Sequence, residues 1–152
     1  MTFDFKQAWT DMVQPILKRP RNMQVAALCW REHEGRIEVL LITSRDTGRW
    51  ILPKGWLIDG LDGPRSALQE AWEEAGVKEA DLITDPIGSY DYEKRQDSGY
   101  DIPVEAKVYK ARAITLSDDF PEADERTRKW VTPAEAATMV REPGLQRILR
   151  NM

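Results

Sequence analysis

The sequence contains a single cysteine, Cys29, and a single histidine, His33, among its 152 residues. One cysteine permits no intrachain disulfide and no thiolate zinc cluster. One histidine, in a stretch that we expect to form a turn, excludes zinc sites built on several imidazoles and hydrolases of the Ser-His-Asp type. Any catalysis must therefore use carboxylates, hydroxyls, lysine or arginine.

Long apolar runs are also missing, so no segment is expected to span a bilayer. The first residues have no apolar stretch after a basic start, which a secretory signal would show. Lys and Arg number 22 against 26 Asp and Glu, a net charge of -4, so a polyanion would need a local basic patch. We expect a cytoplasmic protein without a membrane partner, for which nucleic acid is at most a 5′-end substrate.

The pattern of apolar residues predicts one domain over residues 1–152 with an N-terminal arm over residues 1–20. Strand-like segments alternate with polar and Gly-containing connections, and helical segments follow the third and the last of the strands. This order predicts one mixed sheet covered by at least two helices. The strands are expected over 23–30, 37–43, 49–53, 87–92, 104–113 and 129–132, and the helices over 64–75, from 132 onward and over 143–152.

The helix expected over residues 64–75 carries an unfavourable set of charges. Pro64 suits its first position and Gly76 the residue just past its end. Glu70, Glu73 and Glu74 share one face, and like charges at this spacing repel by about 0.2–0.5 kcal/mol per pair. They also lie in the half of the helix where the macrodipole is negative. A bound hard divalent cation would make this arrangement favourable; the alternative is an acidic face that water solvates.

Residues 55–77, GWLIDGLDGPRSALQEAWEEAGV, resemble the Nudix box, which is written G-x5-E-x7-R-E-U-x-E-E-x-G-U with U aliphatic. Gly55 matches the opening glycine, and Gly76 and Val77 match the closing pair without insertion or deletion. The matching glutamates are Glu70, Glu73 and Glu74.

Two positions depart from the family pattern. Leu61 stands where the first Glu belongs, and Gln69 stands where the Arg belongs. One acidic and one basic position are thus both neutral, which leaves the local charge unchanged. Gln69 lies one turn before Glu73 and can donate a hydrogen bond to it, but without charge. These departures bear on rate and substrate range more than on metal binding.

The resemblance extends over about residues 20–140, where RPRNMQVAALCWR, LLITSRDTGRWILPKGW, GSYDYEKR and KWVTPAEA are similar to the bacterial diphosphoinositol polyphosphate phosphohydrolase-like branch of the Nudix hydrolases. This resemblance implies an α/β fold, an α/β/α sandwich with a mixed β-sheet. It also implies hydrolysis of a diphosphate linkage that depends on Mg²⁺, with Mn²⁺ as a substitute. In that family the helix glutamates bind the metal, and one of them or a Glu of a later loop deprotonates water.

From the residues and the resemblance together we assign candidate roles. Glu70 and Glu74 are expected as direct metal ligands, and Glu73 as a third ligand or as the group that orients water. Glu70 and Glu73 are the candidate catalytic residues. A later loop with Glu122, Asp124 and Glu125 could supply another base near the metals, or could be an acidic loop that water solvates. The Gly55 carbonyl is a further candidate metal ligand. The candidate substrate-binding residues are Arg21, Ser44, Arg45, Arg49, Lys54, Lys94 and Arg95.

The predicted function is a Mg²⁺-dependent pyrophosphohydrolase acting on a small, highly charged substrate such as a diphosphoinositol polyphosphate or a dinucleoside polyphosphate. One alternative is a nucleotide or RNA 5′-end pyrophosphohydrolase. Another is a degenerate domain that binds a phosphorylated ligand with little turnover, which Leu61 and Gln69 would explain. The sequence leaves a monomer and a homodimer both open.

Overall fold

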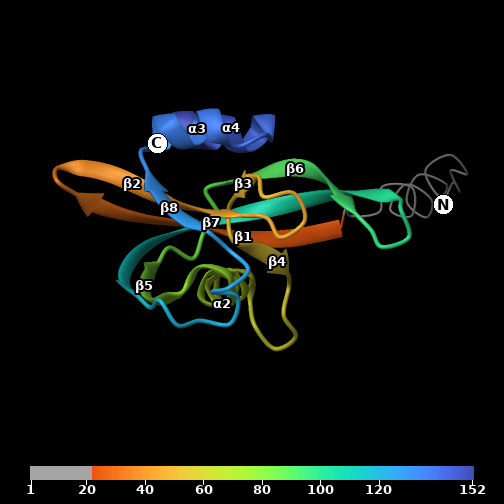
Figure 1. Ribbon diagram of the computed structural model, residues 1–152, viewed down its shortest axis with the longest axis horizontal. Coiled ribbons are helices and arrows are strands. Elements are labelled where there is room, and N and C mark those ends of the chain that lie inside the picture. The colour runs from red at the N-terminus through yellow and green to blue at the C-terminus, as the bar shows by residue number, and fades with distance from the viewer. Residues whose placement is uncertain (1–21) are drawn as a thin grey trace, which may run out of the picture.

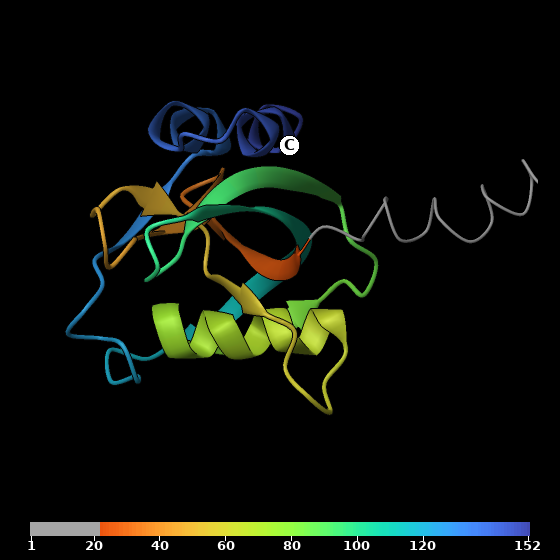
Figure 2. The same cartoon turned by 90° about the vertical axis from the view of Figure 1, so that its right-hand side faces the viewer.

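The structure, a computed structural model, describes residues 22–152. One eight-stranded sheet lies between helix α2 on one face and helices α3 and α4 on the other (Figures 1 and 2). This is the α/β/α sandwich that the resemblance implies. The N-terminal arm and Arg21 lie outside the described residues. The elements are β1 (Asn22–His33), β2 (Arg36–Thr43), β3 (Trp50–Ile51), β4 (Lys54–Trp56), α2 (Gly63–Ala75), β5 (Val77–Leu82), β6 (Gly88–Arg95), β7 (Asp101–Leu116), β8 (Arg128–Val131), α3 (Pro133–Met139) and α4 (Pro143–Arg150).

The sheet is mixed, as predicted. Its strands run in the order β3-β2-β1-β7-β5, while β4 pairs with β1, β6 with β7 and β8 with β2. The long central strands β1 and β7 are parallel, and the pairings of the other strands are antiparallel. Strands β4 and β5 were not predicted from the sequence. Pairing of β4 with β1 places Gly55 opposite Val25.

The two faces of β1 build two separate cores because side chains alternate along a strand. Ala26 and Leu28 pack under α3 and α4, whereas Ala27 and Cys29 pack under α2. Cys29 is fully buried, and this burial raises the pKa of its thiol to about 12. It is a core residue, as its place in an apolar strand predicted.

Helix α2 has the ends that its sequence predicts. The Asp62 side chain accepts a hydrogen bond from the backbone N–H of Arg65 at 2.9 Å, and Pro64 lies in the first turn. Gly76 ends the helix in the left-handed conformation with φ of 72°. The Ser66 hydroxyl accepts a hydrogen bond from the backbone of Ile58 at 3.1 Å, which ties the preceding loop to the helix.

Gly76 cannot carry a side chain in this structure, because an added Cβ would lie 2.6 Å from Phe120 Cδ1 and 2.9 Å from Arg128 Nη1. We expect Gly76→Ala to lower the free energy of unfolding by about 2–4 kcal/mol, from the left-handed backbone and the contacts together. Gly48→Ala is the matched control: its φ is 69° but nothing lies within 4 Å, so about 1 kcal/mol should be lost. Urea unfolding of both variants measures this difference; equal losses would contradict it.

Candidate active site

The first part of the site is the contact between Gly55 on β4 and Glu70 on α2. A Cβ added to Gly55 would lie 2.5 Å and 2.8 Å from the two carboxylate oxygens of Glu70. Glycine therefore lets the Glu70 carboxylate lie directly against the β4 backbone. This contact joins the first and the central parts of the box, 15 residues apart in the sequence.

Glu74, one turn later, is buried with 4% of its surface exposed. Its Oε2 accepts a hydrogen bond from the backbone N–H of Lys54 at 3.1 Å, and its Oε1 accepts one from Arg126 Nη2 at 2.8 Å. Glu74 is therefore not part of an acidic face that water solvates.

The loop before β8 brings a fourth carboxylate to the helix. The backbone N–H of Glu122 donates to the carbonyl of Glu73 at 3.0 Å. The Glu122 side chain then accepts from the same Arg126 nitrogen that binds Glu74, at 3.0 Å. Arg126 also donates to the carbonyl of Thr43 at 3.0 Å, and its guanidinium is almost fully buried. Glu122 thus lies where the sequence suggested a loop carboxylate could lie.

Glu73 lies on the half-buried side of the same helix. Gln69 Nε2 donates a hydrogen bond to Glu73 Oε1 at 3.0 Å, as the one-turn spacing predicts. Gln69 therefore positions this carboxylate without adding a charge to it.

Burial and crowding of carboxylates destabilise the charged form of Glu70. Desolvation is the largest cause, followed by the charges of Glu74 and Glu73, and together they raise the pKa of Glu70 to about 8. Burial also raises the pKa of Glu74, against the opposing effects of Arg126 and Lys54. These two adjacent carboxyl groups therefore lack sufficient positive charge from the described protein, and a cation would relieve this.

The side chain of Lys54 lies on the other face of β4, beside the ring of Tyr92. Its Nζ is 4.9 Å from the centre of the Tyr92 ring, and burial lowers the pKa of its ammonium to about 8 in spite of Glu74 and Glu142 nearby. The Arg49 guanidinium forms an ion pair with Glu142, which is buried at the start of α4. Arg49 and Lys54, which the sequence places on either side of β3, thus lie close enough for each charge to act on the other, with Glu142 near both.

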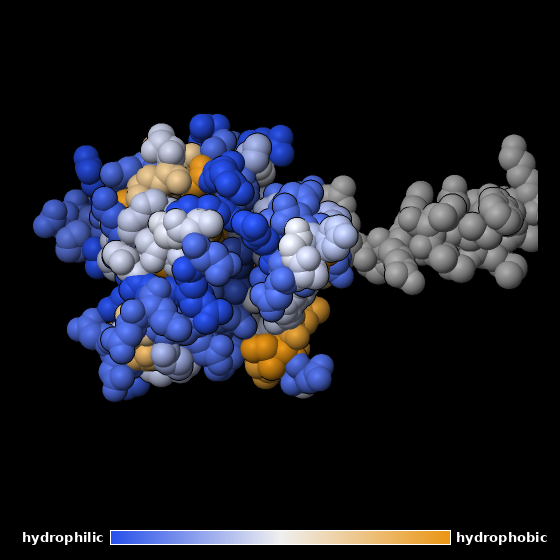
Figure 3. All heavy atoms as spheres, turned by 45° about the vertical axis from the view of Figure 1, so that its right-hand side comes forward, coloured by the Kyte–Doolittle hydropathy of each residue, from blue (hydrophilic) through white to orange (hydrophobic). Residues whose placement is uncertain are grey.

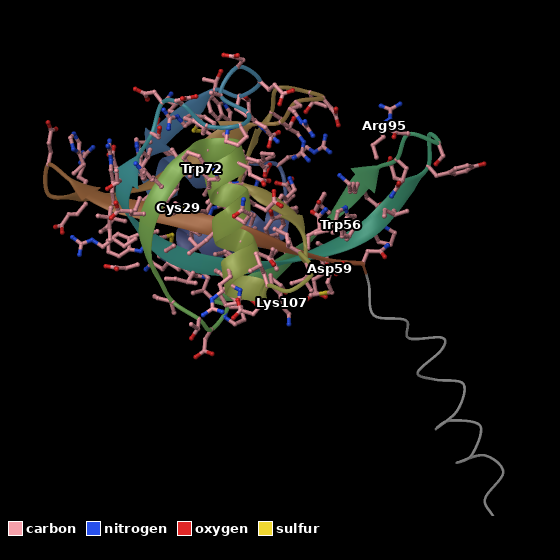
Figure 4. The ribbon with its side chains drawn as sticks, turned by 90° about the horizontal axis from the view of Figure 1, so that it is seen from below. Cys29, Trp56, Asp59, Trp72, Arg95 and Lys107 are labelled. Carbon is pink, nitrogen blue, oxygen red and sulfur yellow. The ribbon has the colours of Figure 1, made fainter. Side chains whose placement is uncertain are left out.

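The other predicted substrate residues lie at different distances from this centre. Arg45 is exposed and forms ion pairs with Glu122 at 3.3 Å and with Glu125 at 3.6 Å. Ser44 forms a hydrogen bond with Thr47 within the β2–β3 loop. Lys94 is close enough to Lys54 to lower its pKa. Arg95 lies at the far end of β6, away from α2 (Figure 4).

The carboxylates of the described residues do not form a complete metal-binding site by themselves. Within residues 22–152, no group of three or more His, Cys, Asp or Glu side chains is arranged to hold a metal ion. Arg126 holds Glu74 and Glu122, and Gln69 holds Glu73. The Glu70–Glu74 pair beside the β4 backbone still fits a divalent cation, because it offers clustered hard oxygen ligands whose negative charge is incompletely balanced.

Sequence reasoning missed Arg126, Glu142, Tyr92 and Gln24 as parts of the site. The Tyr92 hydroxyl donates a hydrogen bond to the Gln24 side chain, and the Tyr92 ring lies beside Lys54. Of the four, only Arg126 had a local signal, since it follows Glu122 by four residues and an i, i+4 ion pair is a known pattern.

Comparison with known families gives a match to the model described as NUDIX domain over residues 20–152. Among curated proteins, "Nudix hydrolase 13, mitochondrial" of Arabidopsis thaliana is 31% identical over 130 residues, which cover 78% of this chain and 60% of that protein. "Nudix hydrolase 16, mitochondrial" of the same plant is 30% identical over 113 residues, 72% of this chain and 62% of that protein. The chain spans about three fifths of the length of these relatives.

Solved structures agree on the fold. The crystal structure of C. elegans Ap4A hydrolase matches with a TM-score of 0.64 at 20% identity, covering 86% of this chain and 94% of that chain. The NUDIX domain of Shewanella oneidensis NrtR, complexed with ADP ribose, matches with a TM-score of 0.59 at 19% identity, covering 99% of this chain and 97% of that chain. Among the described helices, none is long and apolar enough to cross a membrane.

Proposed function

The chain belongs to the NUDIX domain family, and we propose that it is a Mg²⁺-dependent pyrophosphohydrolase that cleaves a diphosphate linkage in a small phosphorylated substrate. The observation that carries this proposal is the pair of adjacent carboxyl groups, Glu70 against Gly55 and Glu74 against the Lys54 backbone. Both lie on a helix whose last turn has no basic residue. A purely structural role would account for Glu74, which the Lys54 backbone and Arg126 already bind, but not for the second carboxyl group, Glu70, beside it.

We assign the metal to Glu70, Glu74 and the backbone carbonyl of Gly55. Bound there, Mg²⁺ or Mn²⁺ would neutralise the diphosphate oxygens and make a bound water more acidic. Glu74 is fixed for this role by the Lys54 backbone. Arg126 balances part of its charge when no metal is bound.

Two carboxylates are candidates to orient the attacking water and accept its proton. Glu73 is held by Gln69, and Glu122 is held by Arg126 next to Glu74. Because Glu73 lies on the box helix with its carboxylate fixed by a neutral partner, we assign the role of base to Glu73 and keep Glu122 as the alternative.

Lys54 and Arg49 are proposed to bind the substrate phosphates from the other face of β4. The Lys54 ammonium is buried beside Tyr92, so an arriving phosphate would meet a desolvated charge, and its interaction would be strong. Arg45, which is exposed at the mouth of the β2–β3 loop, would add a guanidinium that suits two phosphate oxygens.

For the substrate class we place a dinucleoside polyphosphate first. Three arginines around the site, Arg45, Arg49 and Arg126, already have carboxylate partners, so among the described residues little unpaired positive charge remains beside the box glutamates for a densely phosphorylated ring. Trp56 follows Lys54 by two residues in β4, so both side chains point to one face. It is 42% exposed and offers a nucleobase a stacking surface. This preference rests on Trp56 rather than on the likeness to an Ap4A hydrolase.

A diphosphoinositol polyphosphate is the second candidate, and it is supported by the sequence similarity over residues 20–140. A panel of both substrate types, nucleotide sugars, nucleoside triphosphates and 5′-triphosphorylated RNA, assayed with and without Mg²⁺, tests the proposal. Metal-dependent release of phosphate or nucleotide is the expected result. No turnover of any compound, with Mg²⁺ still bound, would favour the degenerate ligand-binding domain.

Trp56→Ala separates the two substrate classes. We expect it to raise KM for a dinucleoside polyphosphate about tenfold through loss of stacking, with KM for a diphosphoinositol polyphosphate unchanged. Tyr100→Ala, which removes an exposed aromatic ring at the β6–β7 turn, is the control and should change neither. Near Trp56 in the sequence, Leu57 and Leu61 are also exposed in the loop before α2, where apolar surface lies open to solvent (Figure 3). An equal KM increase for both substrates would show that Trp56 does not recognise a base.

A further inference from the structure

A cavity of about 650 Å³ lies at the end of the sheet where the β1–β2 hairpin extends past α3 and α4. Trp30 on β1, Ile37 on β2 and Lys110 on β7 form its floor. The start of α3 and the end of α4, with the C-terminus of the chain, form its walls (Figure 1). This volume is within the range of pockets that hold small organic ligands.

The cavity is separate from the candidate active site. Gly55 pairs with Val25 of β1, and Trp30 is five residues farther along that strand, roughly 16 Å at the rise of a β-strand. Trp30 also points to the α3–α4 face together with Leu28, whereas Glu70 and Gly55 meet on the α2 face.

The charged side chains that line this cavity are all basic. Arg36, Lys110 and Arg150 line it, and none of the residues lining it is Asp or Glu. Within residues 22–152 these three cations form no ion pair. The Nζ of Lys110 is 5.2 Å and the guanidinium carbon of Arg112 is 5.8 Å from the centre of the Trp30 ring. Uncompensated cations are therefore concentrated here on a chain with a net charge of -4.

The rest of the lining is apolar. Ile37, Pro133, Leu149 and Met152 contribute to it with Trp30, so a ligand that binds here needs an apolar or planar part besides its negative charge. A free inorganic anion would leave this surface in contact with water.

We propose that this cavity is an accessory binding site for a phosphorylated organic molecule of the size of a mononucleotide. Its phosphate binds Arg36, Lys110 and Arg150, and its ring or apolar part packs against Ile37 and Pro133. Ligand bound there contacts both the hairpin and the two C-terminal helices.

The test is a titration of the full-length native protein with AMP in the presence of a chelator, followed by ¹H–¹⁵N NMR. AMP has no diphosphate linkage to hydrolyse. We expect the backbone amides of Ile37 and Ala134 and the indole of Trp30 to shift together. Lys110→Glu should raise the apparent Kd at least about tenfold, because a charge-assisted hydrogen bond is replaced by repulsion.

Lys107→Glu is the matched control, since it makes the same charge change on the same strand. Lys107 is exposed and lies on the α2 face, three residues from Lys110 (Figure 4). The Kd of the Lys107→Glu variant for AMP should therefore stay within about twofold of the native value. Should Lys110→Glu fail to fold, Arg36→Glu repeats the test, because Arg36 is exposed at the first position of β2. Inorganic phosphate should bind about tenfold more weakly than AMP, because it buries no apolar surface.

Three results would overturn the proposal. One is that AMP shifts only the amides near Lys54 and Gly55. Another is that Lys107→Glu weakens binding as much as Lys110→Glu. The third is that AMP produces no shift at millimolar concentration.

Discussion

Glu74→Gln should reduce metal-dependent turnover about 100-fold or more, in a protein that still folds. The change removes one negative charge from the proposed metal ligands, and even residues that only support a metal ligand contribute about 10–100-fold. The amide can still accept a hydrogen bond from the Lys54 backbone, but its NH₂ group cannot accept one from Arg126. We therefore also expect a loss of about 1–3 kcal/mol in the free energy of unfolding.

Steady-state kinetics with the substrate found in the panel, at several Mg²⁺ concentrations, measures this effect. Glu79→Gln makes the same change on an exposed position of β5 and should keep native kinetics. Full Mg²⁺-dependent turnover by Glu74→Gln would show that Glu74 is not a metal ligand.

Glu70→Gln should have opposite effects on stability and on activity. In the metal-free protein the pKa of Glu70 is raised from 4.5 to about 8. Below pH 4.5 this carboxyl is protonated in both folded and unfolded states. Between pH 4.5 and 8 only the unfolded state loses the proton, so the contribution of Glu70 to stability falls as the pH rises through this range. Glutamine, which is neutral at every pH, removes this dependence.

We expect metal-free Glu70→Gln to melt several degrees above the native protein at pH 8 and within about a degree of it at pH 4.5. Mg²⁺ should raise the melting temperature of the native protein, because it binds only the folded state, and should leave that of Glu70→Gln nearly unchanged. Turnover should fall about 100-fold or more. Thermal melts at both pH values, with Glu79→Gln as the control, test this. A pH-independent difference between native and Glu70→Gln would contradict the raised pKa.

Much of the fold could be predicted because its signals are local. The Pro64 start, the Gly76 end and the apolar face between them predict helix α2 to within one residue. Strands β4 and β5 carry no such signal. β4 is three residues long, and β5 pairs with β7 through an irregular register between Val77 and Ala80. Such strands form because the partner strand is already in place, and a sequence pattern does not show the partner.

In the candidate site too, the parts with local sequence signals could be predicted and the long-range pairings could not. The box glutamates were found because their spacing is local and resembles a family pattern. The ion pair between Arg49 and Glu142 joins residues 93 positions apart, and that between Arg126 and Glu74 joins residues 52 apart. Their partners are determined by the packing of loops and helices on the sheet, so the sequence alone predicts basic substrate-binding residues where the structure has paired charges. The roles of all these residues in catalysis remain predictions.

The position of Cys29 has a practical consequence for measurements on this protein. The only thiol of the chain is enclosed between the sheet and α2, and its raised pKa keeps the unreactive protonated form. A thiol reagent can therefore modify the protein only when α2 separates from the sheet. Because α2 also carries the box glutamates, the rate of labelling with and without Mg²⁺ would report how strongly the metal holds this helix in place, without any substrate.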